Sequence, residues 1–591
     1  MRYMQYGGDY QIEDRGHLLR RAARIGRHLR WAALGALGLT VVATIARLLG
    51  PLVVSVGIDE GIAAGDTGII ARESLTFLGI LIVQYVAQQR SQYAVAVVGE
   101  RFLFELRSRV FEKLTRLDIP FFSRSKTGVL VSRMTSDIES ITEFVNEGAV
   151  LALTNILTAV GVAVAMLLLD VQLGLAALAV IAVLVVISYV FQRHAATAYQ
   201  QVRERIGRVL ASLQEGITGV RVVQAFTQES EQAENFGRVN ERYFDANMSA
   251  ARAISWYFPA VAFLRIVATG VILLIGGRRV VSGDLSFGAL VAFLLYLNWF
   301  FEPIVNLANV YNLLQASLAA LGKLFELLDT EATVVERPGS LDLAHPTPGR
   351  LELHDVTFGY ENGPPVVTGL SLVVPAGQRL AVVGETGAGK STIAKLLMRF
   401  YDPDGGQVTV DGHDLRHLTF ASRARAVALI PQDGYLFEGS LRENFRYARP
   451  EATDQEIWDI CRAMGIDEWV TSLPDGLDTE VRERGSRFSA GERQLVALGR
   501  AFLADPGVVV LDEATSNLDP ETEVQVEGAL RVLLAGRTAV VIAHRLRSAE
   551  RADRVVMIDE GRIIADGTHL ELAERNASYR RLVDVWQRGI E

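Results

Sequence analysis

A glycine-rich segment at residues 384–391 has the residue types and spacing that bind the phosphates of a nucleotide. Its sequence, Gly-Glu-Thr-Gly-Ala-Gly-Lys-Ser, matches the pattern G-x-x-x-x-G-K-[ST] without a mismatch. Glycines let backbone N–H groups face phosphate oxygens, and a helix N-terminus adds positive potential. We expect Lys390 to contact the β- and γ-phosphates and Ser391 to bind Mg²⁺ through its hydroxyl. The residues of this segment expected to contact ATP are Gly384, Glu385, Thr386, Gly387, Ala388, Gly389, Lys390, Ser391 and Thr392.

The residues on either side predict the strand–loop–helix unit that this chemistry requires. The apolar run 380–383 before the glycines is typical of a buried strand. After them, Ile393, Leu396 and Leu397 recur at helical spacing. This context makes a chance match to the phosphate-binding pattern unlikely as an explanation of the segment.

Two later apolar runs end in polar residues that suit hydrolysis of a nucleotide. Residues 507–511 are followed by Asp512 and Glu513, and residues 539–543 by His544. An aspartate at a strand end can hold the Mg²⁺ shell, and the adjacent glutamate can polarise the attacking water. The predicted catalytic residues are Glu513, His544 and Lys390.

Composition narrows the class of protein further. The chain has 591 residues, of which half are apolar, and this length suggests two or more domains. A net charge of −9 excludes nucleic-acid binding as a property of the whole chain. The single cysteine, Cys461, excludes an intrachain disulfide, and no Cys/His cluster has metal-binding spacing.

Six segments of the N-terminal half are long and apolar enough to cross a membrane, which needs about 20 residues. The third and fourth are joined only by residues 170–172, which predicts an antiparallel hairpin. Arginines precede the first segment, and we expect an amphipathic helix on the cytoplasmic surface there, as the positive-inside rule favours. The predicted spans are residues 31–56, 75–98, 148–169, 173–191, 257–275 and 287–307.

This pattern predicts four parts of the chain. An even number of crossings places the long polar connections and the nucleotide-binding half on the same side as the N-terminus, in the cytoplasm. The expected parts are a cytoplasmic helix at 1–30, a six-helix transmembrane domain at 31–325, a linker at 326–350 and an ATP-binding α/β domain at 351–591.

Polar residues inside the predicted spans are costly in lipid and therefore informative. One interpretation is that they line a partly wet substrate pathway, which we favour for the charged Arg265 and Glu302. The other is that they join neighbouring helices through hydrogen bonds, and the glutamines fit both interpretations equally. The candidate pathway residues are Gln84, Gln88, Arg265, Asn298 and Glu302.

With these motifs in place, nearly the whole chain resembles an ABC transporter of the exporter type. The resemblance implies an α-helical membrane domain with six transmembrane helices plus a cytoplasmic α/β P-loop NTPase domain. It implies that Tyr360 stacks on adenine, that Gln432 joins Ser391 and Asp512 at Mg²⁺, and that residues 516–519 form the D-loop. Residues 479–485 resemble the exporter X-loop. Segments near 135–138 and 219–226 resemble the coupling helices that contact the ATPase domains.

The resemblance also implies a dimer that holds two ATP molecules between its ATPase domains. Each ATP meets the phosphate loop of one chain and the signature motif of the other. The usual Leu-Ser-Gly-Gly-Gln signature is here Phe-Ser-Ala-Gly-Glu, with Ser489, Ala490, Gly491 and Glu492 facing the partner's ATP. An altered signature beside an intact Glu513 favours a heterodimer with one impaired site, and a homodimer that tolerates the changes is the alternative.

The function expected from these features is ATP-driven export of a hydrophobic or amphipathic drug or lipid by alternating access in a cell inner (plasma) membrane. A lipid flippase and an importer of fatty acids or siderophores with exporter architecture remain open. A channel or receptor is disfavoured because the hydrolytic residues are complete. The partners expected are a second half-transporter chain, membrane lipid and the substrate, with no nucleic acid.

Overall fold

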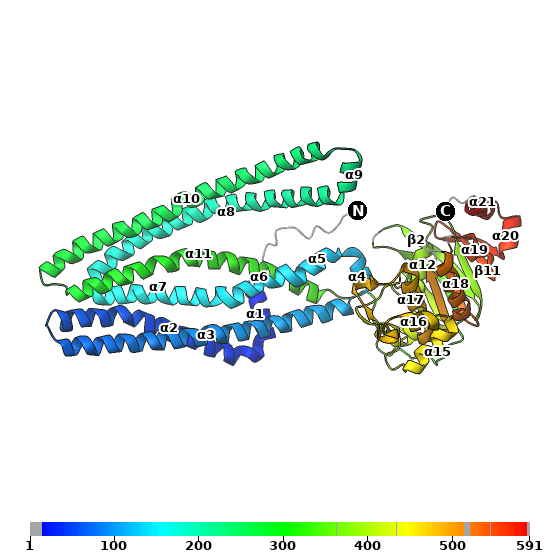
Figure 1. Cartoon of the computed structure of the whole chain (residues 1–591), viewed down its shortest axis with the longest axis horizontal. Coiled ribbons are helices and arrows are strands. Elements are labelled where there is room, and N and C mark those ends of the chain that lie inside the picture. Colours follow the sequence, from blue (N-terminus) through cyan, green and yellow to red (C-terminus); the bar gives the residue numbers. More distant parts are fainter. Residues whose placement is uncertain (1–14, 362, 433, 513–519, 544, 588–591) are drawn as a thin grey trace. The chain divides into compact units, whose positions relative to one another are not determined.

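The computed structural model describes residues 15–361, 363–432, 434–512, 520–543 and 545–587 (Figure 1). The chain divides into two compact units. Unit 1 comprises residues 1–116 and 126–330, and unit 2 comprises residues 117–125 and 331–591.

The described part of unit 1 consists of helices joined by short turns, and six of its helical stretches are long and apolar enough to cross a membrane. This confirms the predicted number of spans. The helices extend well beyond the apolar runs into the polar connections, with interruptions near Pro120, Gly128 and Gly219. The helices are α1 (Arg15–Ile25), η1 (Gly26–Leu29), α2 (Arg30–Val56), η2 (Gly57–Ile62), α3 (Thr67–Arg116), α5 (Thr127–Ser132), η3 (Arg133–Asp137), α6 (Ile138–Glu143), η4 (Phe144–Gly148), α7 (Ala149–Leu169), α8 (Val171–Thr218), α9 (Val220–Ala225), α10 (Glu229–Val281) and α11 (Phe287–Asp329).

The hairpin between α7 and α8 turns at a single residue, Asp170. Its carboxylate accepts a hydrogen bond from the Leu173 backbone N–H at 2.9 Å, which caps α8. The other carboxylate oxygen accepts from Arg279, in the last turn of α10, at 2.6 Å. One side chain therefore begins α8 and ties the hairpin to α10, and Figure 1 shows α8 and α10 running together to the short α9.

Unit 2 contains two main sheets. A four-stranded antiparallel sheet has the order β2-β1-β4-β5, and a six-stranded sheet has the order β12-β11-β3-β10-β9-β6. In the second sheet β11, β3, β10, β9 and β6 pair in parallel. The strands are β1 (Leu351–Gly359), β2 (Pro365–Val374), β3 (Arg379–Val383), β4 (Gly405–Val410), β5 (His413–Asp414), β6 (Val427–Ile430), β7 (Gly439–Ser440), β8 (Glu480–Val481), β9 (Val508–Asp512), β10 (Thr538–Ile542), β11 (Arg554–Asp559) and β12 (Arg562–Gly567).

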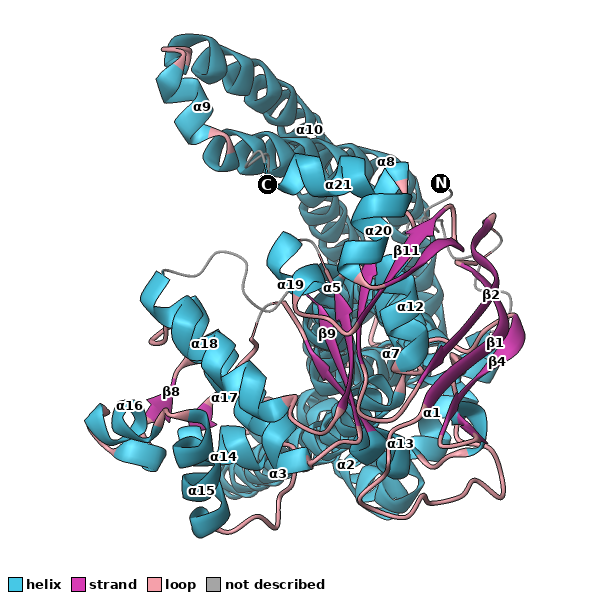
Figure 2. Cartoon of the chain, turned by 90° about the vertical axis from the view of Figure 1, so that its right-hand side faces the viewer, coloured by secondary structure: helices cyan, strands magenta, loops and turns pink. Residues whose placement is uncertain are grey.

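Helices cover these sheets, as the apolar parallel strands require. Figure 2 shows α12 among the strands and α17 and α18 beside β9. A buried apolar cluster joins both sheets to α12, and a second joins α15, α17 and α18 to β6 and β9. The helices are α4 (Ile119–Arg124), α12 (Lys390–Leu397), η5 (Leu415–His417), α13 (Phe420–Ala426), α14 (Leu441–Arg446), α15 (Asp454–Met464), α16 (Asp467–Ser472), η6 (Gly476–Asp478), η7 (Glu483–Gly485), α17 (Ala490–Ala504), α18 (Pro520–Leu533), α19 (Leu546–Glu550), α20 (His569–Arg575) and α21 (Ala577–Gln587).

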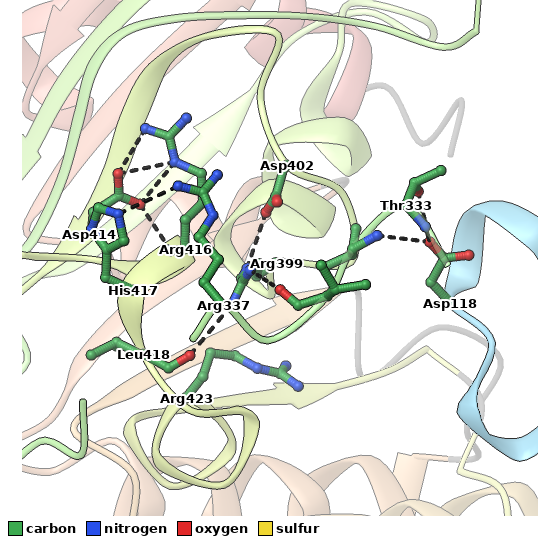
Figure 3. A network of polar contacts seen from close by, with 12 residues as sticks. Asp118, Thr333, Arg337, Arg399, Asp402, Asp414, Arg416, His417, Leu418 and Arg423 are labelled. Carbon is green, nitrogen blue, oxygen red and sulfur yellow. Dashed lines mark hydrogen bonds and ion pairs between the residues drawn. The ribbon is translucent and has the colours of Figure 1, made fainter. Parts of the chain in front are cut away.

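The segment between α11 and β1 is bonded to unit 2 rather than free. Arg399, whose side chain is buried, donates to the Val335 carbonyl at 2.8 Å and to Asp402 at 3.0 Å. Figure 3 shows this arginine among the surrounding polar contacts. The Ser422 hydroxyl accepts a hydrogen bond from the Leu343 N–H at 2.8 Å. Residues 331–350 are therefore fixed along their length by unit 2.

A short stretch from the N-terminal half also belongs to unit 2. The first coupling segment, which we expect near residues 135–138, lies in unit 1, where Lys323 donates to Asp137 at 2.9 Å, and its contact with the ATPase domain stays a prediction. The stretch grouped with unit 2 is residues 117–125, which contains α4. The physical reason is the fixed docking of Asp118, described below.

Candidate nucleotide-binding and membrane sites

The glycine loop follows β3 and leads into α12, as predicted. Gly384 and Gly389 have φ angles of +152° and +105°, a region that favours glycine. A Cβ at Gly384 would lie 2.2 Å from the Ile558 carbonyl oxygen. Only glycine fits there, so the backbone of the loop is shaped by its neighbours before a ligand arrives.

Lys390 occupies the position that a phosphate-binding lysine requires. Lys390 is 5% exposed, and its Nζ donates to the carbonyl oxygens of Gly384 at 2.7 Å and Glu385 at 2.8 Å. The ammonium therefore lies inside the loop at the N-terminus of α12. A cation at this place, with the loop N–H groups and the helix terminus, fits the phosphates of ATP.

The other predicted residues follow strands of the six-stranded sheet. Asp512 is the last residue of β9 and pairs with Ile542 of β10. Gln432 follows β6, and its side chain is exposed. Because β3, β10, β9 and β6 are parallel, their carboxyl ends meet at one edge, beside the glycine loop. Glu513, His544 and the D-loop residues 516–519 lie outside the described residues.

Tyr360 comes directly after β1, and its hydroxyl lies 3.0 Å from Thr392 Oγ1. Its ring makes edge contacts with Phe358 and Tyr401 at 5.1 and 5.3 Å between centroids. Lys395 Nζ lies 5.3 Å from the ring centroid. The ring is thus fixed next to α12, the helix that begins with Lys390, while its contact with adenine stays a prediction.

The signature residues form the start of α17. Ser489 is the N-cap: its hydroxyl accepts from the Glu492 N–H at 3.1 Å, and Glu492 Oε2 accepts from the Ser489 N–H at 2.6 Å. Ala490 is exposed and Gly491 is buried. Glu492 Oε1 also accepts from the Trp469 indole N–H at 2.7 Å.

These contacts give a local reason for glutamate where the family has glutamine. A carboxylate only accepts hydrogen bonds, and here its two oxygens serve two N–H donors, those of Ser489 and Trp469. A glutamine amide has one oxygen, and its NH₂ group would face a donor. The residue pair was missed from sequence because nothing in the spacing of Trp469 and Glu492 indicates contact.

Replacing Glu492 with glutamine should therefore destabilise the start of α17. We expect a loss of about 1 kcal/mol, because one N–H donor loses its acceptor. The measurement is thermal unfolding of the detergent-solubilised chain. The effect of Glu492→Gln is measured once in the unsubstituted chain and once in a chain that also carries Trp469→Phe. The loss should shrink in the Trp469→Phe background, and an equal loss in both backgrounds would contradict the role of Trp469.

The candidate pathway residues lie on three different helices of unit 1. Gln84 is half-buried and Gln88 is exposed on α3, while Arg265 on α10 is exposed. Asn298 donates to the Leu294 carbonyl of its own helix at 2.9 Å and is also exposed. The structure of this single chain therefore leaves most of these polar groups uncovered by unit 1.

Glu302 has a charged partner that the sequence interpretation missed. Arg47 on α2 lies 3.8 Å from the Glu302 carboxylate and 4.9 Å from the Trp299 ring centroid. The Glu302 side chain is still 66% exposed. The signal available from sequence was the presence of an arginine inside the first apolar run.

Asp118 joins α4 to the segment after α11, both within unit 2. Its carboxylate caps α4 by accepting from the Phe121 N–H at 3.2 Å. It also accepts from the Thr333 N–H at 2.5 Å, the Thr333 hydroxyl at 2.6 Å and the Val334 N–H at 2.9 Å (Figure 3). Four donors on one carboxylate hold α4 in place.

Replacing Asp118 with alanine should loosen α4. Loss of an N-cap costs about 1 kcal/mol. This raises the fraction of molecules in which α4 is locally unfolded roughly fivefold. Trypsin should then cleave after Arg124 about fivefold faster than in the unsubstituted chain, since proteolysis follows the open population. Cleavage sites in α20 and α21 serve as internal controls, and an unchanged rate at Arg124 would show that Asp118 does not hold α4.

The same carboxylate gives a pH dependence. Burial raises the pKa of Asp118, but hydrogen bonds from Thr333, Val334 and Phe121 outweigh burial and leave the pKa below 3.8. Because the folded-state pKa is lowered, the stabilisation is complete above the unfolded-state value of about 3.9 and is lost as pH falls through the folded-state value. Hydrogen exchange of residues 119–124 should show equal protection at pH 7 and 5 and reduced protection once the pH falls through the lowered pKa of Asp118, and Asp118→Asn should remove that change.

Comparison with known proteins gives a family, two relatives and one solved structure. The family descriptions "ABC transporter transmembrane region" and "ABC transporter" match residues 34–304 and 367–516. YknV of Bacillus subtilis (strain 168), an uncharacterized ABC transporter ATP-binding protein, is 35% identical over 544 residues, covering 92% of this chain and 90% of YknV. The multidrug efflux ATP-binding/permease protein Rv0194 of Mycobacterium tuberculosis (strain ATCC 25618 / H37Rv) is 36% identical over 563 residues, covering 95% of this chain and 47% of Rv0194. The structure of a bacterial Atm1-family ABC exporter with ATP bound has a TM-score of 0.77 and 27% identity, covering 94% of this chain and 98% of that chain.

Proposed function

Since the chain belongs to the ABC transporter family and carries the transmembrane and ATP-binding regions in one polypeptide, we propose that it exports a hydrophobic or amphipathic compound. It is a multi-pass membrane protein and a transport ATPase. The similarity to a multidrug efflux protein and to an Atm1-family exporter supports export over uptake.

The observation that carries the proposal is the pairing of two features in one chain. One is the glycine loop with Lys390 Nζ held inside it. The other is a set of apolar helices on which Arg265, Asn298 and Glu302 remain exposed. Polar groups inside membrane spans need water or a partner, and Glu302 stays 66% exposed although Arg47 lies 3.8 Å away, so a polar path through a dimer of such chains accounts for their position.

We assign the chemistry of ATP turnover to the following roles. Lys390 holds the β- and γ-phosphates, and His544 contacts the γ-phosphate. Glu513 orients and polarises the attacking water. Ser391, Asp512 and Gln432 are the residues that would hold Mg²⁺, which when bound neutralises charge on the phosphates.

Transport follows from closure of two ATPase domains around ATP. Ser489 and Gly491 of one chain would face the ATP held by the phosphate loop of the other. Closure changes the membrane helices from an inward-facing to an outward-facing arrangement, and α4 and α9 are the segments we assign to transmit it. The N-terminus and unit 2 lie in the cytoplasm, and the membrane is the plasma membrane.

The partner is a second half-transporter chain, and we favour a different chain over a second copy. Ala490 in the signature supports this, because a methyl group stands where phosphate approaches the backbone. Glu492 supports it less than the sequence suggested, since its two hydrogen bonds give it a structural role. Full, cooperative ATPase activity of this chain reconstituted alone would contradict the heterodimer.

The direct test is ATP-dependent transport in inside-out vesicles that contain the chain, alone and with its partner. Accumulation of a fluorescent amphipathic dye that requires ATP and is absent in a Lys390→Ala variant is the expected result. Movement of a labelled phospholipid between leaflets without dye accumulation would instead identify a lipid flippase. ATP-dependent loss of preloaded compound from these vesicles would identify an importer.

A further inference from the structure

A groove at the N-terminal end of unit 1 lies between the segment 24–31 and α3. It has a volume of about 500 Å³ and opens to the surface. Three arginines, Arg24, Arg27 and Arg30, line one side, and Glu105 and Arg109 of α3 line the other. The groove is far in sequence from every residue assigned to nucleotide binding.

The charges in this groove do not cancel. Glu105 forms an ion pair with Arg109 one helical turn away and lies 3.5 Å from His28. Among the described residues, Arg24, Arg27 and Arg30 have no carboxylate within ion-pair distance. Three exposed arginines therefore line one groove without a carboxylate partner among the described residues, and guanidinium groups are the donors that bind phosphate oxygens.

Within the part of the chain that the structure describes, Arg21, unlike the three groove arginines, has a carboxylate partner. It pairs with Asp329 of α11, and its guanidinium carbon lies 4.5 Å from the Phe325 ring centroid. Ile25 and Leu29 are buried beside it. One face of the segment thus anchors it to the helical bundle, and the arginines of the groove belong to the face left free.

The groove lies where polar residues give way to lipid-facing ones. Trp31, which lines the groove, is 72% exposed, and Leu34 on the next turn of α2 is 56% exposed. Phe104, beside Glu105 on α3, is 72% exposed. Tryptophan at such a boundary marks the headgroup level of a bilayer.

We propose that this groove binds an anionic phospholipid. The headgroup phosphate is held by Arg24, Arg27 and Arg30, and the acyl chains lie along the exposed apolar side of α2 that starts at Trp31 and Leu34. A soluble phosphate shares the headgroup chemistry, but it would leave the adjoining apolar surface unused. This lipid site is separate from the transport pathway and does not depend on the identity of the substrate.

The first test measures lipid enrichment around the full-length protein. The protein is reconstituted in phosphatidylcholine vesicles containing phosphatidylglycerol, then extracted, and the retained lipids are quantified by mass spectrometry. We expect the enrichment of phosphatidylglycerol to fall roughly tenfold in R24Q/R27Q/R30Q, since each basic residue near the surface adds to binding of anionic lipid. The control R203Q/R205Q/R242Q removes the same charge from arginines of unit 1 that have no ion pair among the described residues, and it should retain the enrichment.

The second test leaves the arginines intact, so it holds even where the triple variant inserts poorly. Quenching of Trp31 fluorescence, taken as the difference between the unsubstituted chain and Trp31→Phe, is compared for brominated phosphatidylglycerol and brominated phosphatidylcholine. Stronger quenching by the anionic lipid, not competed by soluble glycerol phosphate, is expected. Equal quenching by both lipids, or full competition by glycerol phosphate, would overturn the proposal.

Discussion

Replacing Lys390 with alanine should reduce ATP turnover by about 10²–10³-fold, the effect of removing one preorganised charge donor from a transition state. The reason is geometric. Lys390 is nearly inaccessible to solvent and its Nζ lies inside the glycine loop, between the carbonyls of Gly384 and Glu385.

The measurement is steady-state phosphate release by the purified transporter, with ATP binding followed separately by equilibrium dialysis. Arg575→Ala is a charge-matched control, because Arg575 is exposed in α20 and belongs to neither the loop nor the sheet edge. Both should express and insert equally. Turnover in Lys390→Ala within a few-fold of the control would remove Lys390 from the catalytic site.

Glu513→Gln should abolish turnover while leaving ATP bound, with a decrease of about 10²–10⁴-fold, the range for loss of a general base. The amide cannot take a proton from water, yet it has nearly the same shape as the carboxylate. The described neighbour Asp512 ends β9 in register with Ile542 of β10, at the carboxyl edge of the parallel strands where the glycine loop lies. The expected product of the variant is a stable ATP-bound complex.

Retention of labelled ATP by the variant, together with the loss of phosphate release, distinguishes a catalytic base from a residue needed for binding. Glu550→Gln, an exposed glutamate at the end of α19, is the isosteric control. In a heterodimer the same variant should stop turnover of the whole complex if the partner's site is impaired. Hydrolysis at near the normal rate in Glu513→Gln would refute the role of Glu513.

The local features of this protein could be predicted because each depends on residues close together in sequence. The pattern at 384–391, with an apolar run before it and helical spacing after it, indicates a phosphate-binding turn between a strand and a helix. The six apolar segments likewise predict six helices, because a membrane span needs length and apolarity and nothing from distant residues.

The sequence did not indicate which distant side chains meet. Trp469 and Glu492 form a hydrogen bond that turns an apparent defect in the signature into a capping group with two donors. Asp118 contacts Thr333 across more than 200 positions of the chain, which places α4, rather than residues 135–138, in unit 2.

In the membrane domain, too, the sequence identified charged residues but not the partners they contact. Sequence identified Glu302 as a costly charge, but only the packing of α2 against α11 supplied Arg47 as its partner. Sequence also showed a row of N-terminal arginines, yet their difference in role appeared only when α1 was placed: Arg21 is neutralised by Asp329, whereas Arg24 is not neutralised by any described carboxylate. Residue type and local spacing thus determined the elements and the phosphate chemistry of this protein. The tertiary structure decided which charges are paired, because pairing depends on where the chain returns after a long separation in sequence.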